Sequence, residues 1–284
     1  MRTTGIRPAL ALAVTLVAGL LVATPSGATT PTWLTVPGGI TVAAPAPTGG
    51  AAGPHATPAG CYAGRCEYLA SMYVQGATAK GASATLNQAR PKVVPGERSI
   101  AAIFVGSPDA HQSLAFGWMV SKTAFGDTVP HIVISSVVNN VPQCINGCGF
   151  VPVVTSPPKV AVGHTGKFTI KLSNGKWLLV YNNKTLGYYK TSHWPANKLA
   201  RARLAAAFGE VSSPSKTTPR SDMGNGKLGT SATSAKIVGM QLLAPTGTPT
   251  YSYVAIDAPA KYTIGFTNPT CHKACSMHYG GPGF

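Results

Sequence analysis

Acidic side chains are scarce in this sequence of 284 residues, which has seven Asp and Glu against 23 Lys and Arg. The formal net charge is +16 at neutral pH. Such an excess favours anionic partners, namely cell-envelope polymers, acidic lipids or nucleic acid. The basic residues are scattered singly, without an arginine-rich run or a stacking aromatic motif beside them, so no specific nucleic-acid partner is expected. A solvated lysine surface is the plainer explanation of the charge.

The sequence also lacks the motifs of common catalytic and cofactor sites. It has no GxSxG elbow, no HExxH pair, no Walker-type loop and no dinucleotide fingerprint. Its seven histidines show no recognisable ligand spacing. We therefore expect no cofactor and no metal. Carboxylate chemistry remains, and Glu210 is in the most suggestive place, because it lies in the small apolar segment "AAAFGEVSSP" (205–214), where a buried charge is costly.

There is only one long hydrophobic run, and it lies at the N-terminus. Residues 1–28 combine two arginines, an apolar stretch from Leu10 to Val22 and a small-residue end at Ala28. This pattern predicts a secretory signal peptide, with an uncleaved anchor as the alternative. Its removal lowers the net charge to +14, because two arginines are lost with it. We expect a secreted, extracellular protein without a membrane span after signal removal.

Residues 29–58 are rich in Pro, Ala, Gly and Thr and cannot bury a core. This composition predicts a linker or a short pro-segment. We expect ordered structure to start near Cys61, with one domain over residues 59–284.

The six cysteines fall into three pairs with short spacing, Cys61/Cys66, Cys144/Cys148 and Cys271/Cys275. In an exported protein such spacing favours three local disulfides. Metal binding, with His272 beside Cys271, is the alternative, although the spacings do not form a paired CxxC site.

Short apolar or alternating runs separated by Gly, Pro and Asn indicate strands through most of the domain. The clearest case is residues 167–190, where Asn174-Gly175 and "NNK" (182–184) mark the turns of a three-stranded meander. One segment, "WPANKLARARLAAAF" (194–208), looks helical, since Pro195 suits a first turn and Ala, Leu, Lys and Arg favour helix. The pattern predicts an all-β fold, an antiparallel β-sandwich of two sheets with one short helix.

Seven motifs follow one another over residues 80–284, and a known family has similar motifs in the same order. They are "GASATLNQARPKV" (81–93), "FGWMVSKTAFGD" (116–127), "CINGCGF" (144–150), "LGYYKTSHWPANKL" (186–199), "FGEV" (208–211), "SDMGNG" (221–226) and "HYGGPG" (278–283). Together they resemble the neprosin family of secreted glutamic peptidases. The resemblance implies a β-sandwich with two catalytic glutamates facing each other across a cleft, and cleavage of peptide bonds near proline.

In such a site two close carboxyl groups share one proton. The ionised member activates a water, and the protonated member polarises the scissile carbonyl or protonates the leaving amine. By resemblance, Glu210 in "FGEV" matches the second catalytic glutamate. The first would precede "FGW", and there this sequence has Ala115, which carries no carboxylate. Asp109 is a nearby acid, and Gln112 and His111 are weaker polar substitutes. Asp127 matches a family residue that we expect to be structural.

Two functions are consistent with these residues. The first is a glutamic endopeptidase that uses Glu210 and an unidentified partner acid. The second is a catalytically impaired protein of the same type that binds a peptide or an anionic cell-envelope polymer in the cleft. The side chains proposed to line that cleft are Trp118, Asp127 and Trp194, with Trp177 as a further binding candidate, although tryptophan more commonly packs in a core.

Overall fold

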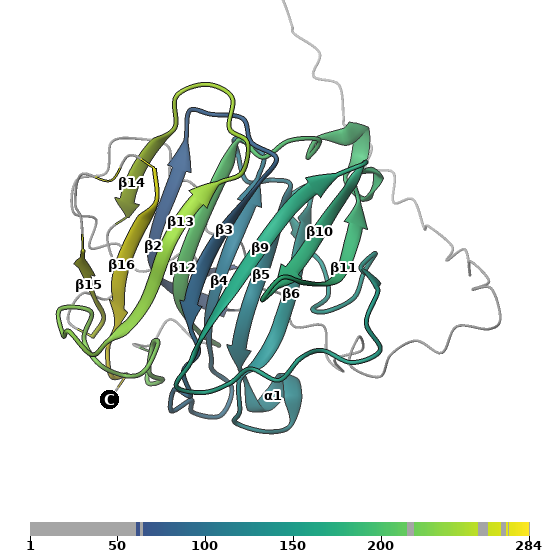
Figure 1. Cartoon of the computed structure of the whole chain (residues 1–284). Coiled ribbons are helices and arrows are strands. Elements are labelled where there is room, and N and C mark those ends of the chain that lie inside the picture. The colour runs from purple at the N-terminus through teal and green to yellow at the C-terminus, as the bar shows by residue number, and fades with distance from the viewer. Residues whose placement is uncertain are drawn as a thin grey trace, which may run out of the picture. The chain divides into compact units, whose positions relative to one another are not determined.

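The structure is a computed structural model, and it describes residues 61–62, 65–214, 219–254, 261–267, 271 and 273–283. The predicted signal peptide (1–28), the predicted linker (29–58) and His272 lie outside these described residues. The described chain forms two antiparallel sheets with little helix, which confirms the predicted fold class (Figure 1).

The first sheet has eight strands and is centred on β12, which pairs with β2 on one side and β4 on the other. Its strands, in spatial order, are β1 (Cys61–Tyr62), β2 (Arg65–Gln75), β12 (Leu204–Ser213), β4 (Arg98–Gly106), β5 (Ser113–Val120), β6 (His131–Val138) and β7 (Val141–Pro142), with β14 (Thr250–Val254) also paired to β2.

The second sheet also has eight strands, and Figure 1 shows its middle strands in front of the first sheet. Its strands, in spatial order, are β15 (Thr263–Phe266), β16 (Cys275–Gly280), β13 (Ala235–Leu242), β3 (Gly81–Asn87), β9 (Thr165–Ser173), β10 (Lys176–Tyr181), β11 (Lys184–Lys190) and β8 (Val151–Pro152).

The predicted meander over 167–190 corresponds to β9, β10 and β11. Its first turn has positive φ angles of 48° at Asn174 and 70° at Gly175, the conformation that a two-residue hairpin turn needs. Polar and apolar residues alternate along β9, so that one side of the strand is buried and the other is exposed.

The main core lies between the two sheets. Phe116 on β5 packs edge-on against Phe168 on β9, with ring centroids 5.1 Å apart. Three tryptophans, Trp118, Trp177 and Trp194, belong to the same buried cluster. Burying side chains of this size supplies much of the hydrophobic stabilisation of such a fold.

The prediction of a helix over residues 194–208 is wrong. A 3-10 turn, Thr191–His193 (η2), precedes the segment, which itself contains one further 3-10 turn, Pro195–Asn197 (η3), and then enters β12 at Leu204. Alanine and leucine favour helix locally, but here both edges of the segment pair with buried strands, and tertiary pairing outweighs propensity. The α-helix of the described chain is α1 (Lys122–Phe125), which Ser121 caps through its side chain.

Disulfides link Cys144 to Cys148 and Cys271 to Cys275, as predicted. Cys66 is also disulfide-bonded, and its backbone pairs with that of Cys61 at the β1–β2 turn. Each predicted pair therefore lies within one local turn of the chain.

Candidate functional site on the outer face of the first sheet

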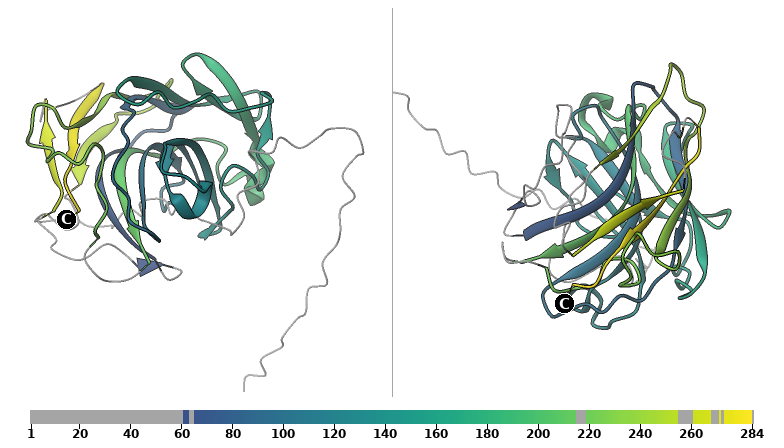
Figure 2. Two further views of the ribbon diagram at one scale, coloured as in Figure 1. Left: turned by 90° about the horizontal axis from the view of Figure 1, so that it is seen from below. Right: turned by 90° about the vertical axis from the view of Figure 1, so that its left-hand side faces the viewer.

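The first sheet has a second buried face, on the side away from the second sheet, which we call the outer face. Leu204, Ala206, Phe208 and Glu210 alternate along β12 toward this side. The hydrophobic cluster on this side draws residues from the first sheet and its loops, α1 included, whereas the main core draws on both sheets. Figure 2, seen from below, shows α1 within the curve of the strands.

Strand register places Ala115 and Glu210 on this one face but in different rows. Ala115 on β5 lies opposite Phe104 on β4, and Phe104 lies opposite Ala206 on β12. Glu210 is four residues further along β12, an offset of about 13 Å at the usual strand rise. The residue that shares the row of Ala115 on β12 is therefore Ala206.

Glu210 instead has charged neighbours at the far end of the face. Its Oε1 lies 3.8 Å from Nη2 of Arg98, and the same nitrogen lies 3.4 Å from Oε1 of Glu67. Arg98 and Glu67 are both register partners of Ser212, one on each side of β12. Arg65 adds a second guanidinium, which donates from Nε to the hydroxyl of Ser212 at 2.9 Å. We call Glu67, Arg98, Glu210 and Arg65 the charged cluster.

The charged cluster is withdrawn from solvent, and its pKa values reflect this. Glu210 has 0% exposure, Arg98 1% and Glu67 9%. Burial raises the pKa of Glu210 well above its ordinary value, and the negative charge of Glu67 adds to the rise, while Arg98 and Arg65 oppose it. Burial and the charge of Arg98 lower the pKa of the Arg65 guanidinium. Within the described chain, neither carboxyl oxygen of Glu210 has a hydrogen-bond partner. A carboxyl group in this setting favours its neutral form.

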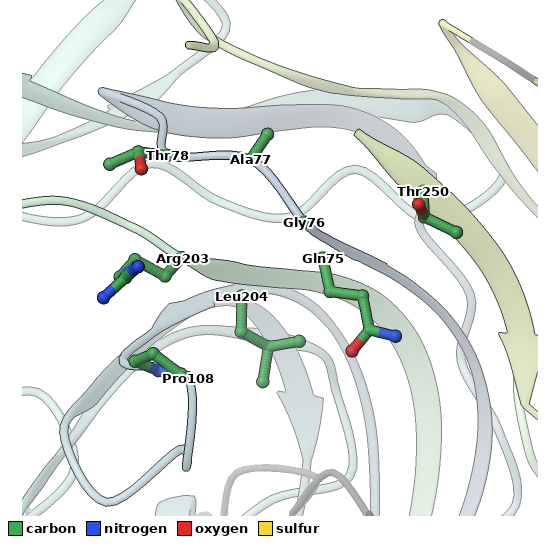
Figure 3. A pocket seen from close by; sticks show the side chains of 8 residues that line it. All are labelled: Gln75, Gly76, Ala77, Thr78, Pro108, Arg203, Leu204 and Thr250. Atoms are coloured by element: carbon green, nitrogen blue, oxygen red, sulfur yellow. The ribbon is translucent and has the colours of Figure 1, made fainter. Parts of the chain in front are cut away.

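A cavity of about 570 Å³ opens at the other end of the outer face (Figure 3). Leu204, one same-face step from Ala206, lies on its wall beside Gln75. The full lining is Gln75, Gly76, Ala77, Thr78, Pro108, Arg203, Leu204 and Thr250. The row of Ala115 and Ala206 is thus the neighbour of this cavity, whereas the charged cluster lies at the opposite end of the face.

The acid proposed from the β4–β5 loop, Asp109, faces a second cavity of about 350 Å³. The hydroxyl of Ser107 donates to its carboxylate at 2.5 Å, and Nδ1 of His111 lies 3.2 Å from it. Gln112 is buried and bonds to Asn139. The hydrogen bond from Ser107 is the largest cause of the lowered pKa of Asp109. The side chain of Asp109 is 58% exposed, so it lies in solvent rather than beside Glu210.

Asp127 lies in the loop after α1. Its carboxylate accepts the backbone N–H of Val129 and lies 2.8 Å from Nε2 of His131, whose ring stacks on Phe125. Burial raises its pKa, but the bonds from His131 and Val129 outweigh that effect and leave the pKa lowered. These contacts hold the loop after α1 together.

The tryptophans proposed for the cleft point the other way. Trp118 donates from Nε1 to the carbonyl of Asn87, and Trp194 donates to the carbonyl of Val137. Trp177 donates likewise to Leu199. All three have 0% exposure and belong to the core between the sheets, which lies on the side of the first sheet opposite to Glu210.

Sequence reasoning missed Glu67 and Arg98 as neighbours of Glu210. They lie 143 and 112 residues away along the chain, and only the pairing of β2, β12 and β4 brings them together. A signal was nevertheless present: Glu67 is one of only seven acids and lies in the strand-like run "RCEYLASMYVQ", where it is as unexpected as Glu210.

Among the described residues we find neither a metal-binding group nor a membrane-spanning helix. These residues contain no group of three His, Cys, Asp or Glu side chains placed to hold a metal ion. No helix in this part of the chain is long and apolar enough to cross a membrane.

Comparison with known proteins places these features in context. The model of the family described as Neprosin matches residues 95–282. A crystal structure of Scytalido-glutamic peptidase with a peptide-based transition-state analogue aligns with 76% of this chain and 98% of its own, at 8% identity and a TM-score of 0.45. A search of curated proteins found no match.

Proposed function

Because the chain belongs to the neprosin family, we propose that it is an exported peptide-binding protein whose outer face has lost most or all peptidase activity. One observation carries the proposal: the row of the outer face that contains Ala115 has no carboxylate. That row consists of Ser252, Tyr73, Ala206, Phe104, Ala115 and Ser135.

Two carboxyl groups must be close to share a proton, and the register does not support such a pair between position 115 and Glu210. They are two strands apart and offset by four residues, which puts their backbones about 16 Å from one another. Position 206 is two strands from Ala115 in the same row, about 10 Å away, which two glutamate side chains could span. Both of these positions are alanine.

A peptide is the ligand class that family membership favours. The cavity beside the row, at about 570 Å³, is within the usual size range for a ligand site. Its wall combines apolar surface from Leu204 and Pro108 with the polar ends of Gln75 and Arg203. Apolar surface would take a side chain such as proline, and the polar ends would bond to the peptide backbone.

A second candidate is a working peptidase that uses Glu210 with Glu67 instead of position 115. It is favoured by the two carboxyl groups beside one Arg98 nitrogen and by the raised pKa of Glu210. In that mechanism Glu67, which lies beside Arg98, would activate a water, and neutral Glu210 would protonate the leaving amine. The full burial of Glu210 weighs against it, because both water and peptide need access to the acid.

Export remains part of the proposal. It is supported by the N-terminal sequence pattern, by the disulfides Cys144–Cys148 and Cys271–Cys275, and by the family. Local disulfides of this kind persist in oxidising compartments.

The test compares binding with hydrolysis. The purified protein without residues 1–28 is titrated with a proline-containing peptide by calorimetry, and the peptide is then followed by mass spectrometry at acidic and neutral pH. We expect saturable binding and an intact peptide. Loss of binding in a Leu204→Arg variant, with the fold retained by circular dichroism, would assign the binding to the cavity.

A further inference from the structure

The outward side of the second sheet, which faces away from the core, is strongly basic. Lys167 and Lys171 on β9 alternate with buried Phe168 and Ile170, so both lysines point outward and are exposed. The same face carries further lysines from the neighbouring strands β10, β11 and β13, namely Lys176, Lys190 and Lys236. We call these five residues the lysine face, and Figure 1 looks onto its strands.

Among the described residues, no acid forms an ion pair with the lysine face. None of the eight strands of the second sheet contains Asp or Glu, and the sequence has no acid between residues 128 and 209. The ion pairs found among the described residues all join groups of the first sheet and its loops, namely Arg98–Glu67, Arg98–Glu210, His111–Asp109 and His131–Asp127. Among the described residues, the acids found in ion pairs therefore belong to the first sheet and its loops, whereas the strands of the second sheet carry lysines and no acid.

One pair of lysines on this face is placed so that the two charges repel each other. Lys176 and Lys190 are direct cross-strand partners on β10 and β11. Like charges placed directly opposite one another destabilise a sheet. Lys176 lies over the ring of Tyr188, 4.5 Å from its centroid, which orders the side chain on this face. A bound anion would remove the repulsion between the two ammonium groups.

We propose that the lysine face binds a linear polyanion with phosphodiester charges, of the poly(glycerol phosphate) type. The phosphates of a flexible chain would pair with successive ammonium groups. Lys167 and Lys171 are about 13 Å apart along β9, a span that such a chain can follow across the strands. Hydroxyls of Thr169, Thr165 and Ser173, on the same side of β9, would donate to phosphate oxygens.

The composition of the face distinguishes this ligand from other polyanions. All five cations are lysines, which act as compact point charges, and none is an arginine with the forked geometry used in nucleic-acid recognition. Leu178 and Val180, between these lysines on β10, are only partly exposed. The exposed valines of the same side, Val151 and Val238, lie apart on β8 and β13, so no continuous apolar surface is available to enter a lipid layer. The face is independent of the outer face of the first sheet, and it does not rest on peptide binding.

The test uses two variants of equal net charge. Lys171→Gln/Lys190→Gln removes two charges from the lysine face, and Lys122→Gln/Lys273→Gln removes two exposed charges from α1 and from the loop before β16. Binding of poly(glycerol phosphate) is measured by calorimetry at several salt concentrations. We expect the first variant to bind about tenfold more weakly at low salt, with a shallower salt dependence, because fewer counterions are released. We expect the control variant to bind as the unaltered protein does.

Three results would overturn the proposal. Equal weakening in both variants would mean that net charge alone attracts the polymer. Absence of binding by the unaltered protein at low salt would also refute it. Tighter binding to anionic vesicles or to duplex DNA than to poly(glycerol phosphate), at equal phosphate concentration, would assign the face to a different class of partner.

Discussion

The carboxyl group of Glu210 has no exposed surface and lies beside both a positive and a negative charge. Burial and Glu67 disfavour its ionised form, and together they outweigh the attraction of Arg98 and Arg65. Its raised pKa means that the folded protein holds a proton on Glu210 that the unfolded chain releases above about pH 4.5.

This difference predicts that stability decreases as pH rises. Where the folded state binds more protons than the unfolded state, the free energy of unfolding falls with pH, by up to about 1.4 kcal/mol per pH unit for one proton. The fall begins above the ordinary pKa of 4.5 and ends at the raised pKa of Glu210. A Glu210→Gln variant keeps the shape of the neutral acid, so urea denaturation from about pH 4 to about pH 9 should give a flatter profile than the unaltered protein.

Asp127→Asn serves as the control, because its effect has the opposite sign. The lowered pKa of Asp127 stabilises the fold above its ordinary value, and that contribution is lost as pH falls. The variant should therefore be less stable by a constant amount above the ordinary pKa of Asp127, and its profile should approach that of the unaltered protein only as pH falls further. A Glu210→Gln profile parallel to that of the unaltered protein would show that Glu210 is ionised in the fold.

A second prediction concerns glutamate substitutions at Ala115 and Ala206. Since they share a row and Glu210 does not, Ala115→Glu alone should leave proline-containing peptides uncleaved. Ala115→Glu/Ala206→Glu places two carboxyls on one row and should raise acidic hydrolysis by about 10²-fold or more, the usual contribution of acid–base assistance. The rate is measured by mass spectrometry, with the double glutamine variant as the control. Equal activity of the single and double glutamate variants would refute the register argument.

At the scale of elements, β12 links the outer face to the main core, because its two sides belong to different clusters. Glycine is needed where the strand passes Tyr279 of β16. A Cβ built on Gly209 would lie 2.1 Å from Cε2 of that ring. Tyr279 is fully buried, so the ring cannot move aside without disturbing the core.

Gly209→Ala should therefore destabilise the protein by about 1–3 kcal/mol, as overpacking usually does. Tyr279→Leu removes the ring, so the double variant should lose less stability than the sum of the two single variants, which a double-mutant cycle in urea measures. Tyr279→Phe keeps the ring and should not relieve the effect. Additive losses in the Leu cycle would mean that the ring is not the obstacle.

The elements also show which parts of the fold the sequence could predict. The meander from β9 to β11 has a local signal, since alternation and an Asn-Gly turn suffice to specify a hairpin. β12 has no such signal: "LAAAF" reads as helix, and only pairing with β2 and β4 makes it a strand. Local patterns could not reveal that pairing, because its partners lie more than 90 residues away.

For the whole molecule, the candidate site could be predicted only in part. The motif around Glu210 lies on β12, and strand alternation places Glu210 on the same face as Ala115. The neighbours of Glu210 could not be predicted, because Glu67 and Arg98 meet it through the order of strands in the sheet. The tryptophans were proposed for a cleft by residue type, whereas the structure buries all three in the core: Trp118 and Trp177 lie on strands and Trp194 lies between two 3-10 turns.

The two sheets of the molecule also differ in the charges that they carry. Glu67 and Glu210 are buried in the first sheet, where two arginines surround them. The second sheet presents lysines without an acid. Each sheet would thus offer its outward side to a different partner, a peptide on the first and a polyanion on the second.

We propose that the protein holds a peptide on its outer face without cleaving it. The most direct measurement follows one proline-containing peptide by mass spectrometry, at saturating protein, from about pH 2 to about pH 8, beside the Glu210→Gln variant. We expect the peptide to stay intact with both proteins while calorimetry records its binding. Cleavage by the unaltered protein that disappears in the variant would contradict the account and would identify Glu210, with Glu67, as the working pair of a peptidase.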